Sequence, residues 1–128
     1  MDKLAKLKKG QIIAVSGCGA VGLSIIKTSK IYGAKTIIAI DIDEKKLRLA
    51  KKFGANYCIN SKKINFKKSI FKNFNKLVDH FFECTGNVSV ISDAYECLNS
   101  RGSEILIGVP KFKQKANFYT LDLHLGKK

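Results

Sequence analysis

Residues 16–24 read "SGCGAVGLS" and place Gly17, Gly19 and Gly22 in the pattern G-x-G-x-x-G. By itself this pattern is a weak signal, because glycines at these spacings occur by chance in many chains. Its meaning depends on the flanking segments. A loop that cradles a pyrophosphate must follow a strand and open a helix.

Both flanking segments meet that condition. Residues 11–17, "QIIAVSG", form a continuous β-branched apolar run, which predicts a strand covered on both faces. Residues 20–32 carry apolar side chains at helical spacing, and Gly33 follows as a stop. In this setting the first glycine makes the turn, the second lets a pyrophosphate approach the backbone, and the third lets the helix lie close to the sheet. The start of the helix then offers N–H groups and the positive end of its dipole.

The same alternation continues along the chain. Further strands are predicted at residues 35–41, 56–60, 77–85 and 103–110, and further helices at 43–53, 63–75 and 87–99. Strands that alternate with helices predict an α/β fold, a Rossmann-like doubly wound parallel sheet of about five strands with helices on both faces. The 128 residues suit a single domain, 1–128, with 1–10 as the end of a preceding helix and 111–128 as a tail.

An acidic residue stands where a dinucleotide site requires one. Asp41 ends the second predicted strand, 19 residues after Gly22. A carboxylate about 20 residues after the glycines binds the ribose hydroxyls and would repel the 2′-phosphate of NADP, so NAD is the expected cofactor. Asp43 suits the N-cap of the next helix, which would leave Asp41 for the ribose. The alternative is that Asp41, too, only serves that helix start.

The charge of the chain is strongly positive. The formal net charge is +14, from 24 basic and 10 acidic residues, and 22 of the basic residues are lysine. Such a charge suggests nucleic acid or an anionic membrane as a partner. The lysines are spread over many predicted elements, and arginine, which recognises phosphates and bases in bidentate fashion, is scarce. We therefore interpret the charge as a solvated surface and do not expect nucleic-acid binding. With no apolar run of about 20 residues and no signal-peptide core, we expect no membrane partner and a cytoplasmic location.

The four cysteines do not form a metal-binding pattern. Cys18, Cys58, Cys84 and Cys97 are far apart, and no pair has C-x-x-C spacing. We expect small buried thiols on the core. Cys84 could be a nucleophile at the end of a strand, but His80, four residues earlier, is too distant along the strand to activate it. We predict no catalytic residue in this chain.

Four segments together resemble a known family. "GCGAVGLS", "IIAIDIDEKKLRLAKKFGANYCIN", "DHFFECTGN" and "GSEILIGVP" are similar, in order and spacing, to the coenzyme-binding domain of the zinc-dependent medium-chain alcohol dehydrogenases. The resemblance covers nearly the whole chain. It implies an NAD(H)-binding domain of an oxidoreductase. In the intact family, hydride passes between an alcohol carbon and the nicotinamide, while zinc polarises the alcohol oxygen.

The resemblance also implies a role for each matching position. The pyrophosphate would lie against Gly17, Gly19, Ala20, Val21 and Gly22, with Val21 also packing on the nicotinamide ring. The adenosine ribose would be bound by Asp41 and Lys46, and the adenosine half would lie near Thr85 and Asn87. The nicotinamide carboxamide would lie against the backbones of Ile107 and Val109. From the residues alone, Lys46 is equally well explained as a solvated helix lysine.

The chain departs from the family pattern in what surrounds this domain. The family's zinc ligands lie in a substrate domain and in the segment before the first coenzyme strand, and no ligands for zinc are found in this chain. The family's sixth strand would begin after its last residues. We therefore expect a truncated coenzyme domain whose partners are a dinucleotide and a separate substrate domain or a second copy of the chain, with an open sheet edge. We expect no alcohol oxidation by the chain alone, even with added zinc.

Other functions share the glycine loop and the acid. A stand-alone NAD-sensing regulatory Rossmann domain is the main alternative, and it would couple NAD occupancy to dimerisation. A methyltransferase would bind S-adenosylmethionine in preference to NAD. Binding of nucleic acid through the lysines would show as a salt-dependent retention on DNA.

Overall fold

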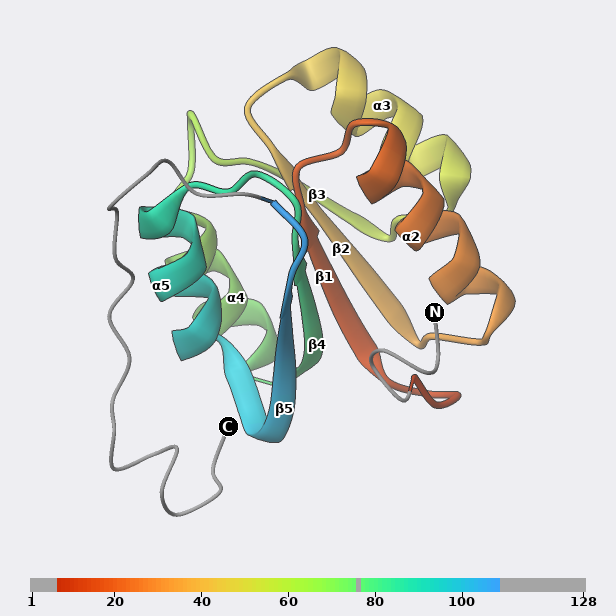
Figure 1. Ribbon diagram of the computed structural model, residues 1–128, viewed down its shortest axis with the longest axis vertical. Helices are drawn as coiled ribbons and strands as arrows, with labels where there is room; N and C mark the ends of the chain where they lie inside the picture. Colours follow the sequence, from red (N-terminus) through yellow and green to blue (C-terminus); the bar gives the residue numbers. More distant parts are fainter. Residues whose placement is uncertain (1–6, 76, 109–128) are drawn as a thin grey trace.

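The computed structural model describes residues 7–75 and 77–108, which form one parallel five-stranded sheet with two helices on each face (Figure 1). The elements are β1 (Ile12–Ser16), α2 (Ala20–Ile31), β2 (Thr36–Asp41), α3 (Glu44–Phe53), β3 (Tyr57–Asn60), α4 (Phe66–Phe74), β4 (Val78–Glu83), α5 (Val88–Glu96) and β5 (Leu98–Leu106). All four strand pairs are parallel, in the order β3-β2-β1-β4-β5. The predicted fold class is confirmed.

The three inner strands, β1, β2 and β4, are buried on both faces because their alternate residues belong to two different cores. Ile13 and Val15 of β1 pack on the side of α2 and α3, whereas Ala14, between them, packs on the side of α4 and α5. The same alternation in β2 sends Ile37 to one core and Ile38 to the other. A strand that contributes to two cores must be apolar at every position, which explains the continuous apolar runs.

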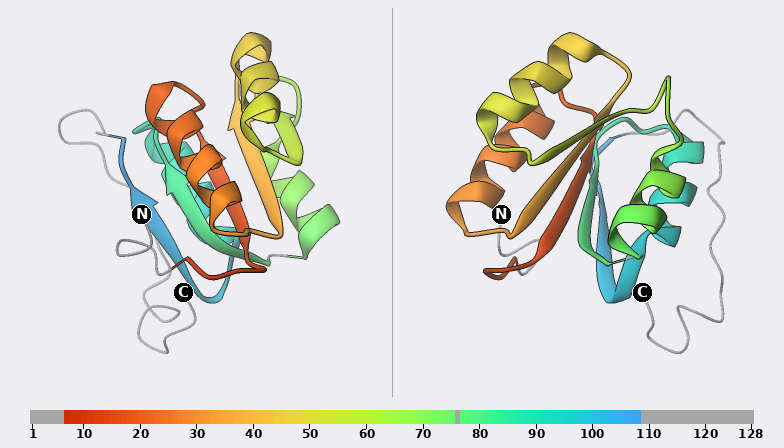
Figure 2. Two further views of the ribbon diagram at one scale, coloured as in Figure 1. Left: turned by 90° about the vertical axis from the view of Figure 1, so that its right-hand side faces the viewer. Right: turned by 180° about the vertical axis from the view of Figure 1, so that it is seen from behind.

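The helices cover the two faces in pairs. α2 and α3 lie on one face, and α4 and α5 on the other (Figure 2). Asp43, Asn65 and Asn87 stand at the N-caps of α3, α4 and α5, where each side chain accepts a hydrogen bond from a backbone N–H of the first turn. The predicted N-cap at Asp43 is therefore confirmed.

The order of the strands creates a crevice at one end of the sheet. The chain moves from β1 outward to β2 and β3, then returns to place β4 on the other side of β1. The segments that follow β1 and β4 consequently depart to opposite faces. Ligands of open parallel sheets bind at such a switch point, beyond the carboxyl ends of the strands. In this chain, that point lies between Ser16 and Glu83, which are partners in the ladder.

The last strand begins earlier than predicted. The sequence predicts a strand at 103–110 after a turn at Gly102, but β5 runs from Leu98 to Leu106. The turn-like residues are absorbed as an irregularity: Val78 pairs with Leu98, whereas His80 pairs with Ser103. Arg101, just before Gly102, has φ +64°, so the chain does turn here, inside the irregular start of β5. A Cβ atom at Gly102 would lie 3.0 Å from the carbonyl oxygens of both Val78 and Asp79, so the glycine also permits a close approach to β4.

Two helices are shorter than predicted. The sequence predicts a helix over 63–75 with Ile64 on its buried side. Instead, Lys63 N and Ile64 N donate to Asn60 O in a turn before α4, and Ile64 is 55% exposed. The predicted helix at 87–99 extends too far at its C-terminal end, because α5 ends at Glu96 and β5 begins at Leu98.

Three further expectations concern the ends and the thiols. Residues 7–10 form no helix, and the predictions for 1–6, 109–110 and the tail 111–128 lie outside the described residues. Cys18 and Cys97 are buried as predicted, but Cys58 is exposed because it lies on the edge strand β3. Within the described ranges, no helix combines the length and the apolar character needed to cross a membrane.

Candidate functional site

The glycine loop makes a tight turn from β1 into α2. Gly17 has φ +88°, a conformation that side chains other than glycine rarely adopt, and its N–H donates to Ile40 O at 2.9 Å. A methyl group on Gly22 would lie 1.9 Å from Gly17 O. The first and third glycines are therefore required by the turn itself, whether or not a ligand is bound.

The second glycine faces open space. Apart from Gly19 itself and its two chain neighbours, no heavy atom of the described structure lies within 4 Å of where a Cβ of Gly19 would stand. Gly19 is also the N-cap of α2, which is the one described helix whose N-cap residue makes no side-chain hydrogen bond. The N–H groups of the first turn of α2, from Ala20 onward, thus point out of a helix start without a side-chain acceptor. This arrangement fits an anionic group.

Asp41 ends β2 beside this loop, and both of its carboxylate oxygens are already engaged. Oδ2 accepts from Cys18 N at 2.7 Å, and Oδ1 accepts from Ile42 N at 2.7 Å and Asp43 N at 2.9 Å. The expectation that Asp41 is left free was therefore wrong. Its carboxylate ties the glycine loop to the β2–α3 connection, and because a carboxylate has about four acceptor sites, capacity for a further donor remains.

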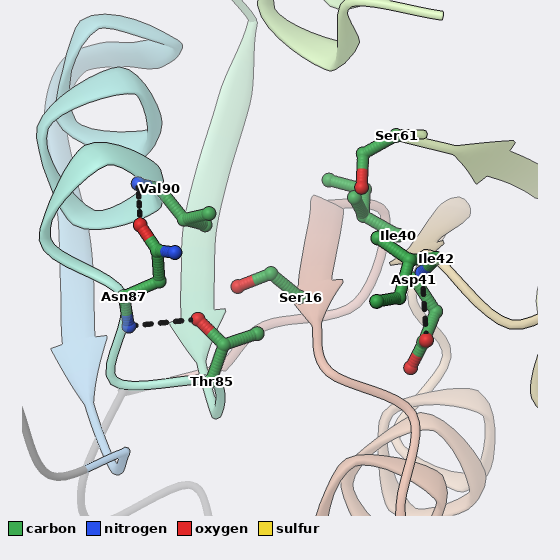
Figure 3. A pocket seen from close by; sticks show the side chains of 8 residues that line it. All are labelled: Ser16, Ile40, Asp41, Ile42, Ser61, Thr85, Asn87 and Val90. Carbon is green, nitrogen blue, oxygen red and sulfur yellow. Dashed lines mark hydrogen bonds between the residues drawn. The ribbon is translucent and has the colours of Figure 1, made fainter. Parts of the chain in front are cut away.

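A pocket of about 170 Å³ opens at the switch point (Figure 3). Its lining comes from the ends of four strands and from α5, namely Ser16, Ile40, Asp41, Ile42, Ser61, Thr85, Asn87 and Val90. Figure 3 shows Thr85, Asn87 and Val90 on one side, Asp41, Ile42 and Ser61 on the other, and Ser16 between them. Apolar walls with polar groups at the rim suit a flat heteroaromatic ring.

Three of the predicted site residues line this pocket, namely Asp41, Thr85 and Asn87. Asn87 Oδ1 accepts from Ser89 N and Val90 N at the start of α5, so its amide nitrogen is the atom that can donate to a ligand. The glycine loop, which leads into Ala20 and Val21, lies next to the pocket. Cys18 N in this loop donates to Asp41, which lines the pocket.

Other predicted residues lie outside the pocket lining. Lys46 is exposed on α3. Val21 is 54% exposed on the first turn of α2, and Ile107 is 37% exposed after β5. Ile107 N donates to Glu83 O at 2.9 Å. Val109 lies outside the described residues.

Sequence reasoning did not single out the remaining lining residues. Ser16 and Ile40 end buried strands, and Ile42 and Ser61 directly follow strands, so the rule that ligands bind beyond the carboxyl ends of parallel strands could have found them. Val90 offers no such signal, because it enters the pocket from the first turn of α5.

Cys84 does not have the properties of a nucleophile. Burial, followed by the charge of Glu83, raises the pKa of the Cys84 thiol to about 11, so the reactive thiolate is disfavoured. His80 is bound elsewhere: its Nδ1 lies 2.7 Å from Ser103 Oγ and its Nε2 lies 2.9 Å from Gln11 Oε1. In residues 7–75 and 77–108, no three His, Cys, Asp or Glu side chains come together as a metal site would require.

Comparison with known proteins places this geometry in a family. A family model described as "Zinc-binding dehydrogenase" matches residues 20–128. This chain belongs to the zinc-binding dehydrogenase family. An S-(hydroxymethyl)glutathione dehydrogenase from Saccharomyces cerevisiae is 42% identical over 131 aligned positions, which cover 98% of this chain and 34% of that protein.

Two solved alcohol dehydrogenase structures agree with this assignment. An alcohol dehydrogenase zinc-binding domain protein from Burkholderia ambifaria superposes with a TM-score of 0.89 at 38% identity, over 98% of this chain and 34% of that one. Benzyl alcohol dehydrogenase from Acinetobacter calcoaceticus gives 0.88 at 34% identity, over 95% and 34%. The chain thus spans about a third of the length of these relatives.

Proposed function

We propose that this chain is the NAD(H)-binding part of a zinc-type alcohol dehydrogenase. The observation that carries the proposal is the uncapped start of α2 at Gly19, held beside the pocket at the switch point by Asp41. A dinucleotide needs an anion site next to a pocket for a heteroaromatic ring, and these two features are adjacent here.

The adenosine half would occupy the pocket. Ile42 and Val90 offer apolar surfaces for the adenine, while Thr85 and Asn87 offer polar groups at the rim. The ribose hydroxyls would donate to Asp41, and Lys46 would reach the same ribose from α3. These assignments are supported by the resemblance to the coenzyme-binding domain of the alcohol dehydrogenases and by the position of the pocket.

The remainder of the dinucleotide would run along the glycine loop. The pyrophosphate would bind to the backbone of Gly17, Gly19 and the first turn of α2. The nicotinamide would then pack on Val21, with its carboxamide at the backbones of Ile107 and Val109. The partly exposed Val21 and Ile107 supply apolar surface for the ring at this end of the sheet.

The reaction proposed for the whole protein is hydride transfer between an alcohol and the nicotinamide. The bound nicotinamide would supply the hydride acceptor, and this chain would bind and orient it. The described residues do not fit a zinc site, so the zinc of such an enzyme would have to be held elsewhere. A separate substrate domain is therefore part of the proposal. The length of the yeast relative supports it, because this chain covers only 34% of that protein.

We expect NAD(H) to be preferred over NADP(H). A 2′-phosphate on the ribose would bring negative charge toward the Asp41 carboxylate, which the backbone hydrogen bonds hold in place. Charges of like sign at contact distance disfavour binding even where water screens them in part.

The test is a titration of the 128-residue chain with NADH and, separately, NADPH, followed by nicotinamide fluorescence. We expect saturable NADH binding and NADPH binding weaker by on the order of tenfold. Asp41→Asn should narrow the difference between the two affinities, because it removes the negative charge. Its NH₂ group would also face a backbone N–H donor of the loop, so we expect the affinity for NADH itself to fall as well. Asp43→Asn is the matched control, since Asp43 caps α3 and does not line the pocket. A folded sample that binds neither nucleotide would refute the proposal.

A further inference from the structure

Glu83 is a fully buried acid at the end of β4, and the proposed coenzyme contacts do not use it. Its exposed fraction is 0%. Burying a carboxylate is costly unless hydrogen bonds replace the lost water. A buried carboxylate therefore constrains whichever donors surround it, and the identity of those donors indicates its role.

The side chain of Glu83 collects donors from two segments. Oε1 accepts from Ser16 Oγ at 3.2 Å, from Thr85 N at 2.7 Å and from Thr85 Oγ1. Oε2 accepts from Gly86 N at 2.9 Å. The carboxylate thus joins the end of β1 to the turn that follows β4.

The backbone of Glu83 reaches a third segment. Its carbonyl oxygen accepts from Ile107 N and Gly108 N, both at 2.9 Å. Glu83 is therefore the point at which the segments after β1, β4 and β5 meet. In the proposed function, these segments contact different parts of the same dinucleotide.

The turn held by Glu83 carries two of the pocket residues. Thr85 Oγ1, which donates to Glu83, also accepts from Asn87 N at 3.0 Å. Asn87 then caps α5 through its own side chain. A chain of hydrogen bonds consequently runs from Glu83 through Thr85 to Asn87, and it fixes both residues at the rim of the pocket.

We propose that Glu83 is a positioning residue for the adenosine half of the coenzyme. It acts through Thr85 and Asn87, whose backbone it holds in the shape that forms one wall of the pocket. This inference rests on the proposed function. In this inference Glu83 fixes the shape of the turn that binds the ligand and does not itself contact the ligand.

The first test uses Glu83→Gln in the full chain, with AMP as the probe in calorimetric titration. The amide side chain places an NH₂ group against N–H donors, so the turn loses an acceptor. We expect AMP affinity to fall by about tenfold, since hydrogen bonds to charged groups are among the stronger ones. Glu104→Gln is the matched control, because Glu104 is a neighbouring carboxyl group on β5 that lies outside the pocket lining. It should bind AMP as the wild type does.

A second readout separates positioning from general stability. Amide hydrogen exchange in Glu83→Gln should accelerate at Thr85, Gly86 and Asn87, while the core amides of Val15 and Phe82 keep their protection. A merely structural role would accelerate exchange at all of these sites together.

A substitution at the exposed residue Thr85 tests the same network in case Glu83→Gln does not fold. Thr85→Val removes the hydroxyl that links Glu83 to Asn87, and Thr85→Ser keeps it. We expect Thr85→Val to weaken AMP binding and Thr85→Ser to restore it. Unchanged AMP affinity and unchanged exchange in Glu83→Gln would overturn the role of Glu83 while leaving the proposed function intact. A wild-type chain that binds neither AMP nor NADH would overturn both.

Discussion

At the scale of single residues, the glycines of the loop differ in what an added side chain would meet. The methyl group of Gly22→Ala would lie 1.9 Å from Gly17 O, so the helix or the turn would have to move. We expect a loss of about 2 kcal/mol in the free energy of unfolding, a typical cost of overpacking. Urea denaturation of the variant against the wild type measures this.

Gly19→Ala provides the contrast. The added methyl group meets no described atom within 4 Å beyond its own residue and the two chain neighbours, and φ at this position is −78°, which alanine adopts readily. Stability should change by less than about 1 kcal/mol. NADH affinity should nevertheless fall by on the order of tenfold, because the methyl group occupies the proposed approach of the pyrophosphate. Wild-type affinity in Gly19→Ala would contradict the placement of the pyrophosphate.

Sequence reasoning succeeded for residues whose position in the fold follows from spacing. Gly17, Gly22 and Asp41 lie where the pattern predicts, because a strand–turn–helix unit fixes their separation. The pattern could not reveal that Asp41 also binds Cys18 N, because that contact joins residues 23 positions apart. Glu83 was missed because nothing in its local sequence distinguishes a buried hydrogen-bonded acid from an exposed one.

At the scale of elements, two asparagine caps allow stability and binding to be separated. Asn87→Ala removes the acceptor for Ser89 N and Val90 N at the start of α5, and should cost about 1 kcal/mol of unfolding free energy. It should also weaken AMP binding, because Asn87 lines the pocket. Thermal unfolding and calorimetric titration measure the two effects.

The control for this prediction is Asn65→Ala. Asn65 caps α4 by accepting from Lys68 N, so its loss should cost a similar amount of stability. Since Asn65 does not line the pocket, AMP affinity should stay at the wild-type value. Equal loss of affinity in both variants would mean that binding merely follows stability.

Element types were predictable, whereas some boundaries were not. The apolar runs identified β1, β2 and β4 because these strands are covered on both faces. The edge strands β3 and β5 were found from shorter apolar runs, although they leave residues exposed. The start of β5 was missed because residues 99–102, "NSRG", have the composition of a turn. They fall within β5 because Leu98 before them and Ser103 after them both pair with β4, a contact between distant segments that local sequence does not reveal.

At the scale of the whole molecule, one acid should impose a pH dependence on stability. Burial, followed by the charge of Glu83, raises the pKa of Glu104 from 4.5 to about 8. Because the folded state holds this proton more tightly than the unfolded state, the stabilising contribution is complete below about pH 4.5. It is lost as the pH rises toward about 8 and is constant above that value.

Glu104→Gln should remove this dependence. We expect the variant to gain stability relative to the wild type as the pH rises from about 5 to about 9, measured by urea denaturation at each pH. Burial lowers the pKa of His80, so His80 contributes stability that is lost as the pH falls below 6.5. His80 is common to both proteins, and its contribution cancels in the comparison. A difference that does not vary with pH would show that Glu104 is solvated.

The sequence by itself determined the class of the fold, the order of its elements and the location of the glycine loop. These follow from local periodicity, from the turn residues and from the distance between Gly22 and Asp41. Only the tertiary structure decided the position of β4 beside β1, the walls of the pocket and the network around Glu83. Each of these joins segments far apart in the chain, and their meeting depends on how the strands are ordered in the sheet rather than on any local pattern.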